Sequence, residues 1–431
     1  MASESFTLEG HILDNRVLAN ALDEILERGA TYEILQLDIG VKREDPSFAH
    51  IKVSAPSEEG LTKLIARLES HGANPDSVAD ATLTRADKTG AFPPGFYSTT
   101  NLDTDVRVDG TWISVERPEM DCGIVVEATS ARTIPMGEVV EGMTIVMRGL
   151  GIRVSPQDED AAGSKQAFEF MSSDVSSEKP KALLVEQVAE QMEAVKAQGK
   201  RILWVAGPAC VHTGSAPDLS ALIRAGYVNA LFAGNGVAAH DIESNIYGTS
   251  LGVYLAQGNP AEHGHEHHIR AINELRRHGT FKAAIDAGVF SDGIVYHLVK
   301  NDCDYLFGGS VRDDGPLPEV VTDMPEVQAQ LRDIIWGKDG NDLIGYCIVV
   351  GTMLHGIATG NCLPASVPLV CVDINQATVT KLMDRGSWQS LGIITDVGLF
   401  IRALAARLAA DEISDPSADA AMRTAGSRTR R

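Results

Sequence analysis

The sequence predicts a multidomain α/β protein, and three observations support that prediction. The chain has 431 residues, of which 44% are hydrophobic, enough for two or three cores because single domains usually span roughly 100 to 200 residues. The spacing of apolar residues changes near residue 89 and again near residue 181. We therefore predict domains over residues 1–88, 89–175 and 181–411, followed by a disordered tail over 412–431.

The first domain is expected to contain strand, helix, strand, strand, helix and strand, in that order. Apolar residues recur at helical spacing in residues 15–30 and 57–73, whereas the neighbouring segments alternate between apolar and polar residues. The last strand is expected at residues 79–84. The expected N-caps and helix ends are Asn15, Ser57, Gly29 and Gly72. This order is typical of a ferredoxin-like α+β fold.

The second and third domains are predicted from changes in the length and spacing of the apolar segments. Between residues 90 and 172, short apolar runs are separated by Gly, Pro and Asp, which indicates a small β-barrel-like domain. Residues 172–180 are polar and end in proline, as linkers often do. From Lys181 onward, helices of ten or more residues alternate with short apolar strands, which favours a Rossmann-like parallel α/β domain.

The composition argues against several kinds of partner. The net charge is −22 and the folded region has no cluster of Lys and Arg that could bind nucleic-acid phosphates. No apolar stretch reaches the roughly 18 residues that a membrane span needs, and no charged region precedes an apolar core at the N-terminus. The six cysteines form no CxxC pair, which argues against zinc. We expect a cytoplasmic protein without metal, nucleic-acid or membrane partners.

In an open parallel sheet, ligands bind at the carboxyl ends of the strands, so the loops after the apolar runs are informative. Five such loops are expected in the third domain, of which the first three read GPACVHTG, AGNGVAAHDIESN and GGSVRDDGPLPE. The candidate residues in these three loops are His212, Asn235, Gly236, His240, Asp241, Glu243, Arg312, Asp313 and Asp314.

The fourth loop reads GTMLHGIATGN, and a helix that begins at Thr352 would present free N–H groups to a pyrophosphate. The next strand ends in Asp373, 22 residues after Gly351. A carboxylate about 20 residues beyond such a loop binds the ribose hydroxyls of NAD and repels the 2′-phosphate of NADP. The spacing therefore predicts NAD, with its adenosine ribose on Asp373. The fifth loop contributes Asp396 and Val397.

Simpler roles are open for these side chains. Asp373 and Asp396 could each cap the helix that follows. His212 and His240 could be hydrogen-bonded structural histidines. The histidines within residues 263–270 are expected to be solvated at a helix start rather than to bind a metal.

Several longer motifs run through the chain: GFYSTTNLDTDVRVDG, EMDCGIVV, GIRVSP, AGNGVAAHDIE, GGSVRDDGPLPEV, GTMLHGIATGN, VCVDINQATVTKL and TDVG. In these motifs the chain closely resembles the archaeal-type ornithine cyclodeaminase family. That family carries the LOR/SDH bifunctional enzyme conserved region and recurs as the C-terminal part of cyanobacterial arginine dihydrolase fusions. The resemblance extends from Phe6 to about Leu408.

The resemblance implies a three-part architecture, bound NAD, and conversion of L-ornithine to L-proline and ammonia with internal hydride recycling. Where the family often has Asn-Ala, this chain has Asn-Gly, which should still allow backbone contact. The implied NAD contacts are Asn235, Gly236, Asp314, Thr352, Met353, Leu354, His355, Gly356, Asp373, Asp396 and Val397.

Such a reaction needs a cation for the substrate carboxylate and a carboxylate or histidine for the amines. Arg312 is the candidate for the carboxylate, and His212 or His240 for the proton carrier. Candidates for the amines are Asp241, Glu243, Asp313 and, from the β domain, Asp121. A homo-oligomer, dimer or tetramer, is expected. Two other functions are open: an NAD-linked dehydrogenase or cyclodeaminase of another diamino acid, and a non-catalytic NAD- or amino-acid-sensing module.

Overall fold

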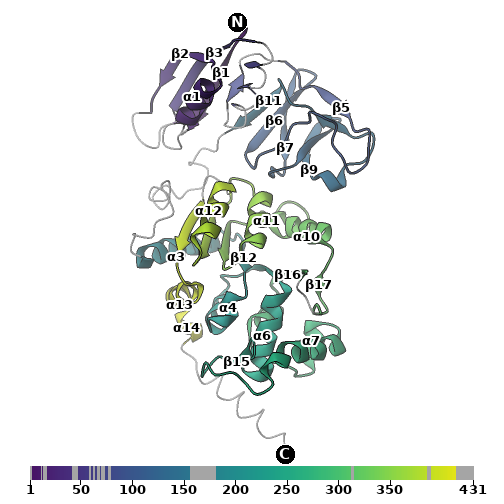
Figure 1. The fold of residues 1–431 in the computed structure, drawn as a ribbon, viewed down its shortest axis with the longest axis vertical. Coiled ribbons are helices and arrows are strands. Elements are labelled where there is room, and N and C mark those ends of the chain that lie inside the picture. The colour runs from purple at the N-terminus through teal and green to yellow at the C-terminus, as the bar shows by residue number, and fades with distance from the viewer. Residues whose placement is uncertain are drawn as a thin grey trace, which may run out of the picture. The chain divides into compact units, whose positions relative to one another are not determined.

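The protein forms two compact units, which are described separately (Figure 1). The computed structural model describes residues 2–10, 12, 17–40, 47–57, 60–61, 64–65, 68, 73–75, 79–155, 181–311, 315–385 and 390–413. The first unit contains the described residues up to 155 and residues 361–366, and the second unit contains the others. The predicted linker and the tail beyond Ile413 lie outside the described residues. No helix within these ranges is long and apolar enough to cross a membrane.

The first unit begins with a four-stranded antiparallel sheet in the strand order β2-β3-β1-β4. Its elements are β1 (Ala2–Gly10), α1 (Val17–Glu27), β2 (Thr31–Asp38), β3 (Ser47–Ala55) and β4 (Asn74–Pro75). Residues 60, 61, 64, 65 and 68 are also helical. Leu64 and Leu68 of that second helix share one buried core with Phe6 and Ile51 of the sheet. The predicted ferredoxin-like fold is confirmed.

Two of the residues predicted to start or end helices in this domain, Ser57 and Gly29, do so. Gly29 follows α1 with φ of 68°, a backbone conformation that a side chain disfavours, so a glycine ends the helix. Ser57 caps the second helix, because its Oγ accepts a hydrogen bond from the backbone N–H of Gly60 at 3.1 Å. The other two predicted markers, Asn15 and Gly72, lie outside the described residues.

A second, curled sheet completes the first unit, with the strand order β11-β6-β7-β9-β8-β10-β5. Its strands are β5 (Leu83–Arg85), β6 (Asp103–Val108), β7 (Thr111–Glu116), β8 (Gly123–Glu127), β9 (Ser130–Ile134), β10 (Thr144–Val146) and β11 (Ile152–Ser155). The prediction that residues 79–84 close the first sheet is wrong, because β5 pairs with β10 here. Gly151 lies so close to Ala81 that a Cβ on it would be 2.2 Å from the Ala81 nitrogen. This approach brings the two edges of the curled sheet together.

The second unit is built on a seven-stranded parallel sheet in the order β17-β16-β13-β12-β18-β19-β20. Its strands are β12 (Ile202–Ala206), β13 (Ala230–Gly234), β16 (Asp304–Gly308), β17 (Val320–Val321), β18 (Tyr346–Val350), β19 (Leu369–Asp373) and β20 (Ser390–Ile394). Apart from β17, numbering the strands along the chain gives the order 3-2-1-4-5-6, that of the Rossmann fold. Every residue of β12 and β18 is buried, as expected for central strands of a parallel sheet.

Helices cover this sheet, and α12, α11 and α10 follow one another across the upper part of the unit in Figure 1. The helices are α3 (Lys181–Ala197), α4 (Ala209–His212), α5 (Ala216–Arg224), α6 (Asn235–Tyr247), α7 (His267–His278), α8 (Phe281–Asp286), α9 (Ile294–Lys300), α10 (Met324–Trp336), α11 (Leu354–Cys362), α12 (Gln376–Arg385), α13 (Val397–Leu408) and α14 (Ala410–Ile413). A short hairpin of β14 (Thr249–Ser250) and β15 (Val253–Tyr254) follows α6. Glu412, at the predicted start of the tail, belongs to α14 and accepts a hydrogen bond from Arg224 at 2.9 Å.

Candidate functional site

The strand order reverses between β12 and β18, and ligands of doubly wound sheets bind in the crevice at such a point. Gly207 and Gly351 follow these two strands and touch through their backbones. A Cβ on Gly207 would lie 1.9 Å from the carbonyl oxygen of Gly351, so no side chain fits there. Gly351 also has φ of 63° and borders Ala209 and Val397. The carboxyl edge of the sheet therefore exposes backbone where a nucleotide would approach.

A helix follows the loop after β18, as predicted, but α11 begins at Leu354 rather than at Thr352. Thr352 and Met353 are half-buried and Leu354 is exposed, so the first N–H groups of α11, which have no intrahelical acceptors, face an accessible edge. His355 turns inward, with its ring 4.9 Å from that of Phe232 and its Nδ1 3.2 Å from the hydroxyl of Thr352. Burial lowers the pKa of His355. Gly356 packs on β18, because a Cβ on it would be 2.7 Å from Val349 Cγ1.

Asp373 lies at the end of β19 and is half-buried. Its Oδ1 accepts a hydrogen bond from the Asn375 N–H at 2.8 Å. The cap of α12 is Asn375 itself, whose Oδ1 accepts from the Ala377 N–H at 2.9 Å. Asp396 differs, because its carboxylate accepts from the Leu399 N–H at 3.0 Å and caps α13. Asp396 therefore caps the helix that follows it, whereas Asp373 does not.

At the end of β13, Asn235 and Gly236 begin α6. Asn235 is buried, and its Oδ1 accepts a hydrogen bond from the Leu317 N–H at 3.0 Å, which ties the loop after β16 to the start of α6. Gly236 lies against Pro208 of the first loop, 3.5 Å from where its Cβ would be. Three residues predicted for the site lie in the loop between β16 and Leu317 and are outside the described residues: Arg312, Asp313 and Asp314.

His212, His240 and Glu243 lie together. The rings of the two histidines are 4.7 Å apart, and His240 Nδ1 is 2.8 Å from Glu243 Oε2. Glu243 is fully buried, and it also accepts hydrogen bonds from the Thr249 hydroxyl and the Gly252 N–H, each at 2.9 Å. Burial alone would raise the pKa of Glu243, but these donors together hold it below its usual value. The site therefore contains a buried carboxylate that stays ionised.

The pKa of His212 is lowered to about 4 by burial and by the neighbouring His240, against a smaller opposite effect of Glu243. Its Nδ1 is 2.7 Å from the hydroxyl of Ser250. His212 is thus neutral at physiological pH. A neutral His212 and the ring of His240, held by an ionised carboxylate, give this cluster groups that can accept and pass on a proton.

Asp241, another candidate for the substrate amines, is placed differently. It is fully buried, and its two oxygens accept hydrogen bonds from the N–H groups of Ile294 (2.9 Å) and Val295 (2.8 Å) at the start of α9. Burial raises the pKa of Asp241 to about 7 although these two donors lower it. The carboxylate caps a helix in the core, so we do not retain Asp241 among the groups that would meet a substrate.

Asp121 belongs to the first unit. It is exposed, has φ of 62°, and accepts a hydrogen bond from Asn361 Nδ2 at 3.3 Å. Asn361 holds the same turn through its carbonyl, which accepts from the Met120 N–H at 2.9 Å. Asp121 remains a predicted substrate contact.

Sequence reasoning missed the outer members of the histidine cluster. Thr249, which donates to Glu243, lies 2.9 Å from His267 Nδ1, and the ring of His268 is 6.4 Å from that of His240. These two histidines come from residues 263–270, so the local histidine density was a signal, although only the fold shows what they approach. Among the residues that the structure describes, no group of three His, Cys, Asp or Glu is arranged to hold a metal ion.

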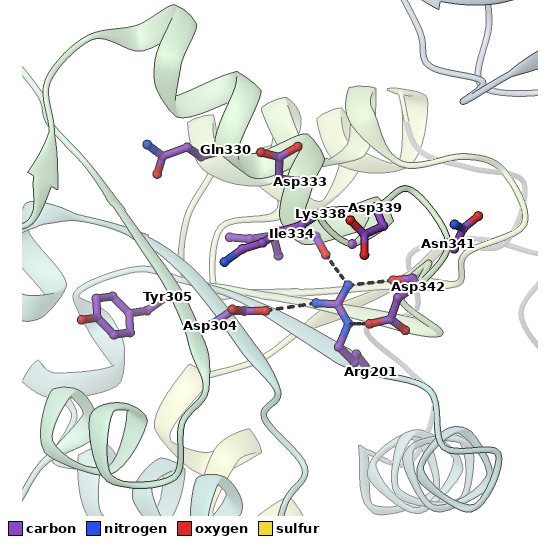
Figure 2. A pocket seen from close by; sticks show the side chains of 11 residues that line it. Arg201, Asp304, Tyr305, Gln330, Asp333, Ile334, Lys338, Asp339, Asn341 and Asp342 are labelled. Atoms are coloured by element: carbon purple, nitrogen blue, oxygen red, sulfur yellow. Dashed lines mark hydrogen bonds and ion pairs between the residues drawn. The ribbon is translucent and has the colours of Figure 1, made fainter.

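A cavity of about 730 Å³ lies at the other end of the strands, near the amino ends of β12 and β16 (Figure 2). Arg201 lies in its wall, and its guanidinium makes ion pairs with Asp304 (3.3 Å) and Asp342 (2.5 Å). The same group donates to the carbonyl oxygen of Ile334 at 2.8 Å. None of the predicted site residues that the structure describes lines this cavity.

Known proteins match the chain over most of its length. A family model described as arginine dihydrolase ArgZ-like, C-terminal, Rossmann fold, matches residues 186–404. The LOR/SDH bifunctional enzyme conserved region matches residues 3–102, and the ArgZ-like C-terminal first region matches residues 103–185. The chain is 46% identical to an ornithine cyclodeaminase of Methanopyrus kandleri, over 94% of this chain and 97% of that protein.

Solved structures agree with these matches. The apo structure of ArgZ, an arginine dihydrolase from the cyanobacterial ornithine–ammonia cycle, superposes with a TM-score of 0.79 at 36% identity. That likeness covers 94% of this chain, which spans 58% of the ArgZ chain. AgrE in ternary complex with ornithine and NAD+ matches 96% of this chain and 59% of its own, with a TM-score of 0.50 and 38% identity. The chain belongs to the archaeal-type ornithine cyclodeaminase family, whose members also form the C-terminal part of ArgZ-like fusion proteins.

Proposed function

We propose that this chain is an ornithine cyclodeaminase that binds NAD and converts L-ornithine to L-proline and ammonia. The observation that carries the proposal is the ionised Glu243 holding His240 beside a neutral His212, on the helices α4 and α6 that follow β12 and β13 of a Rossmann sheet. The names of the relatives and the ligands of AgrE supply the substrate and the cofactor.

The residues around the crevice fit NAD by their chemistry. Gly207 and Gly351 leave the strand ends free of side chains, and the start of α11 offers N–H groups to a pyrophosphate. Asp373 would bind the adenosine ribose. The remaining proposed contacts are Asn235, Gly236, Asp314, Thr352, Met353, Leu354, His355, Gly356, Asp396 and Val397. When bound, NAD supplies hydride acceptance and hydride return, so the overall reaction is redox-neutral.

His240 is the proposed proton acceptor. An ionised carboxylate only accepts hydrogen bonds, so His240 Nδ1 must donate to Glu243. With the Nδ1 proton so engaged, Nε2 is the ring atom that would take a proton from the α-ammonium group of ornithine. Glu243 is then a positioning residue, since it sets both the orientation and the tautomer of His240.

His212 has a supporting role in this proposal. Because it is neutral, it adds no positive charge that would repel the two ammonium groups of ornithine. The nitrogen on the α-carbon leaves as ammonia and the δ-nitrogen closes the ring, so all carbons and one nitrogen remain in proline. Arg312 for the substrate carboxylate, and Asp313 or Asp121 for the amines, stay predictions.

The test is turnover with ornithine at stoichiometric enzyme and a trace of NAD. Many turnovers to proline and ammonia without accumulation of NADH are expected, because the hydride is returned. One turnover per NAD would instead show a dehydrogenase. No ammonia from ornithine, lysine or 2,4-diaminobutyrate would leave a sensing module as the better account.

We further propose a cytoplasmic homo-oligomer. None of the six cysteines, all of which lie in described residues, forms a disulfide, and five of them are buried. Unpaired thiols are typical of proteins in a reducing compartment. Retention of free thiols in freshly prepared protein, measured by thiol titration after unfolding, is the expected result.

A further inference from the structure

The strand β2 (Thr31–Asp38) lies at the outer edge of the first sheet and is exposed along its whole length. One side of its backbone pairs with β3, and no strand among the described residues pairs with the other side, where an edge strand presents its N–H and C=O groups. Proteins usually protect such edges with charged side chains, especially Lys, with Pro, with β-bulges or with short length. β2 has two acids, Glu33 and Asp38, and a bulge after Ile34. These eight residues contain no Lys, Arg or Pro.

The apolar side chains of β2 continue the buried face of the sheet. Tyr32, Ile34 and Leu37 lie opposite Val53, Ile51 and Ala49 of β3, which are buried. Opposite residues of an antiparallel pair share a face, so these three side chains point to the core side. A β-bulge between Ile34 and Gln36 shifts the alternation by one residue and brings Leu37 to that face.

Yet this part of the core face is open. Tyr32, Ile34, Leu35 and Leu37 are 37 to 46% exposed. Leu26 of the neighbouring α1 is 55% exposed. Exposed apolar side chains that adjoin one another, in a chain with a net charge of −22, are typical of an interaction surface.

We propose that the strand that covers it is β2 of a second copy of this chain, paired antiparallel about a two-fold axis between Ile34 and Leu35. Such an axis places Tyr32 opposite the partner's Leu37, and Ile34 opposite the partner's Leu35. On the other face it places Glu33 opposite the partner's Gln36. Apolar residues thus face apolar ones.

No like charges face one another in this register, because Asp38 lies opposite the partner's Thr31. The sequence TYEILQLD is therefore complementary to itself under this one operation, as an isologous interface requires. The two four-stranded sheets would join into one, with both edges satisfied by backbone hydrogen bonds. This interface is independent of the proposed reaction.

The first test is the molar mass of the full chain by sedimentation velocity at micromolar concentration. The wild type is expected to be at least a dimer, and Ile34→Lys is expected to halve its mass, because two ammonium groups would meet near the axis. Leu183→Lys, at a leucine of α3 that is 61% exposed against 41% for Ile34, is the control and should leave the mass unchanged. A monomeric wild type, or an Ile34→Lys variant of undiminished mass, overturns the proposal.

The second test reads the register without destabilising the fold. Glu33→Cys and Gln36→Cys combined place a thiol opposite a thiol of the partner, within the reach of a disulfide. Mild oxidation of the double variant should give covalent dimers on non-reducing gels. Either single variant puts its own thiols several residues apart and should not cross-link. Equal cross-linking in single and double variants would rule out this pairing.

Discussion

In the parallel sheet of the second unit, the amino ends and the carboxyl ends of the strands are built in opposite ways. At the amino edge, a large cavity is lined by charged side chains that satisfy one another around Arg201. At the carboxyl edge, glycines let backbones touch, and the polar side chains either fix a histidine or lie half-buried at strand ends. The comparison teaches that the described cavity and the residues proposed for the site lie at opposite ends of the same strands. What distinguishes the carboxyl ends is a buried carboxylate, Glu243, that holds a histidine rather than an arginine.

The largest effect is expected where the two central loops touch. Gly207→Ala would place a methyl group 1.9 Å from the carbonyl oxygen of Gly351. We expect it to lower the free energy of unfolding by about 3 kcal/mol, as overpacking does, measured by denaturant titration. Gly360→Ala is the control, since nothing lies within 4 Å of its added Cβ. Equal stability of the two variants would contradict the close contact.

The next effect separates two acids of α6. Glu243→Gln can donate an amide N–H to His240 Nδ1, which moves the ring proton to Nε2 and removes the proposed proton acceptor. We expect ornithine turnover to fall about 100-fold, the scale of a lost general base. Asp241→Asn, on the same helix and equally buried, should lower thermal stability but change turnover little.

The tautomer itself gives a measurement that does not depend on turnover. Nitrogen-15 NMR of the wild type at neutral pH should show the His240 proton on Nδ1. The groups facing this ring are His212 of α4, Glu243 of α6 and His268 of α7. A proton on Nε2 would sink the assignment of His240 as the base.

A smaller effect is expected from an acid at the carboxyl end of a strand, with an acid at an amino end as its control. Asp373→Ala should weaken NAD binding about 10- to 100-fold, the scale of lost hydrogen bonds to a charged group, in a calorimetric titration. Asp304→Ala, at the amino edge, removes an ion pair to Arg201 and should leave NAD affinity unchanged. Comparable losses in both variants would erase the distinction between the edges.

The smallest effect is a pH dependence of stability. The pKa of His212 is about 4 in the fold, below the value of roughly 6.5 in an unfolded chain. Between these values the unfolded state binds the proton first, so stability falls as the pH drops from 6.5 toward 4. His212→Gln should flatten this fall, measured as the free energy of unfolding at pH 7 and pH 5. The raised pKa of Asp241 makes its own contribution to stability increase as the pH falls, and this contribution is the same in the wild type and in His212→Gln.

Much of the architecture could be predicted from local patterns, because helical spacing, caps and strand-end loops are local properties. The assignment of β5 failed because its partner β10 is distant in the chain, so its sheet cannot be read from its own residues. Asp241 and Glu243 are two acids two residues apart in the sequence that forms α6, and nothing local distinguishes them. Only the tertiary fold, which brings the start of α9 to Asp241 and the β14–β15 turn to Glu243, separates their roles.

The pairing at the centre of the parallel sheet has a consequence for how the protein folds. Ile202 of β12 pairs with Tyr346 of β18, whereas the other neighbours in each half of the sheet are closer along the chain. Closing a longer loop costs more chain entropy and slows the contact. We therefore expect the two halves to form first and to join last. The crevice exists only after that final step, so a cofactor can stabilise the finished fold but cannot template its early assembly.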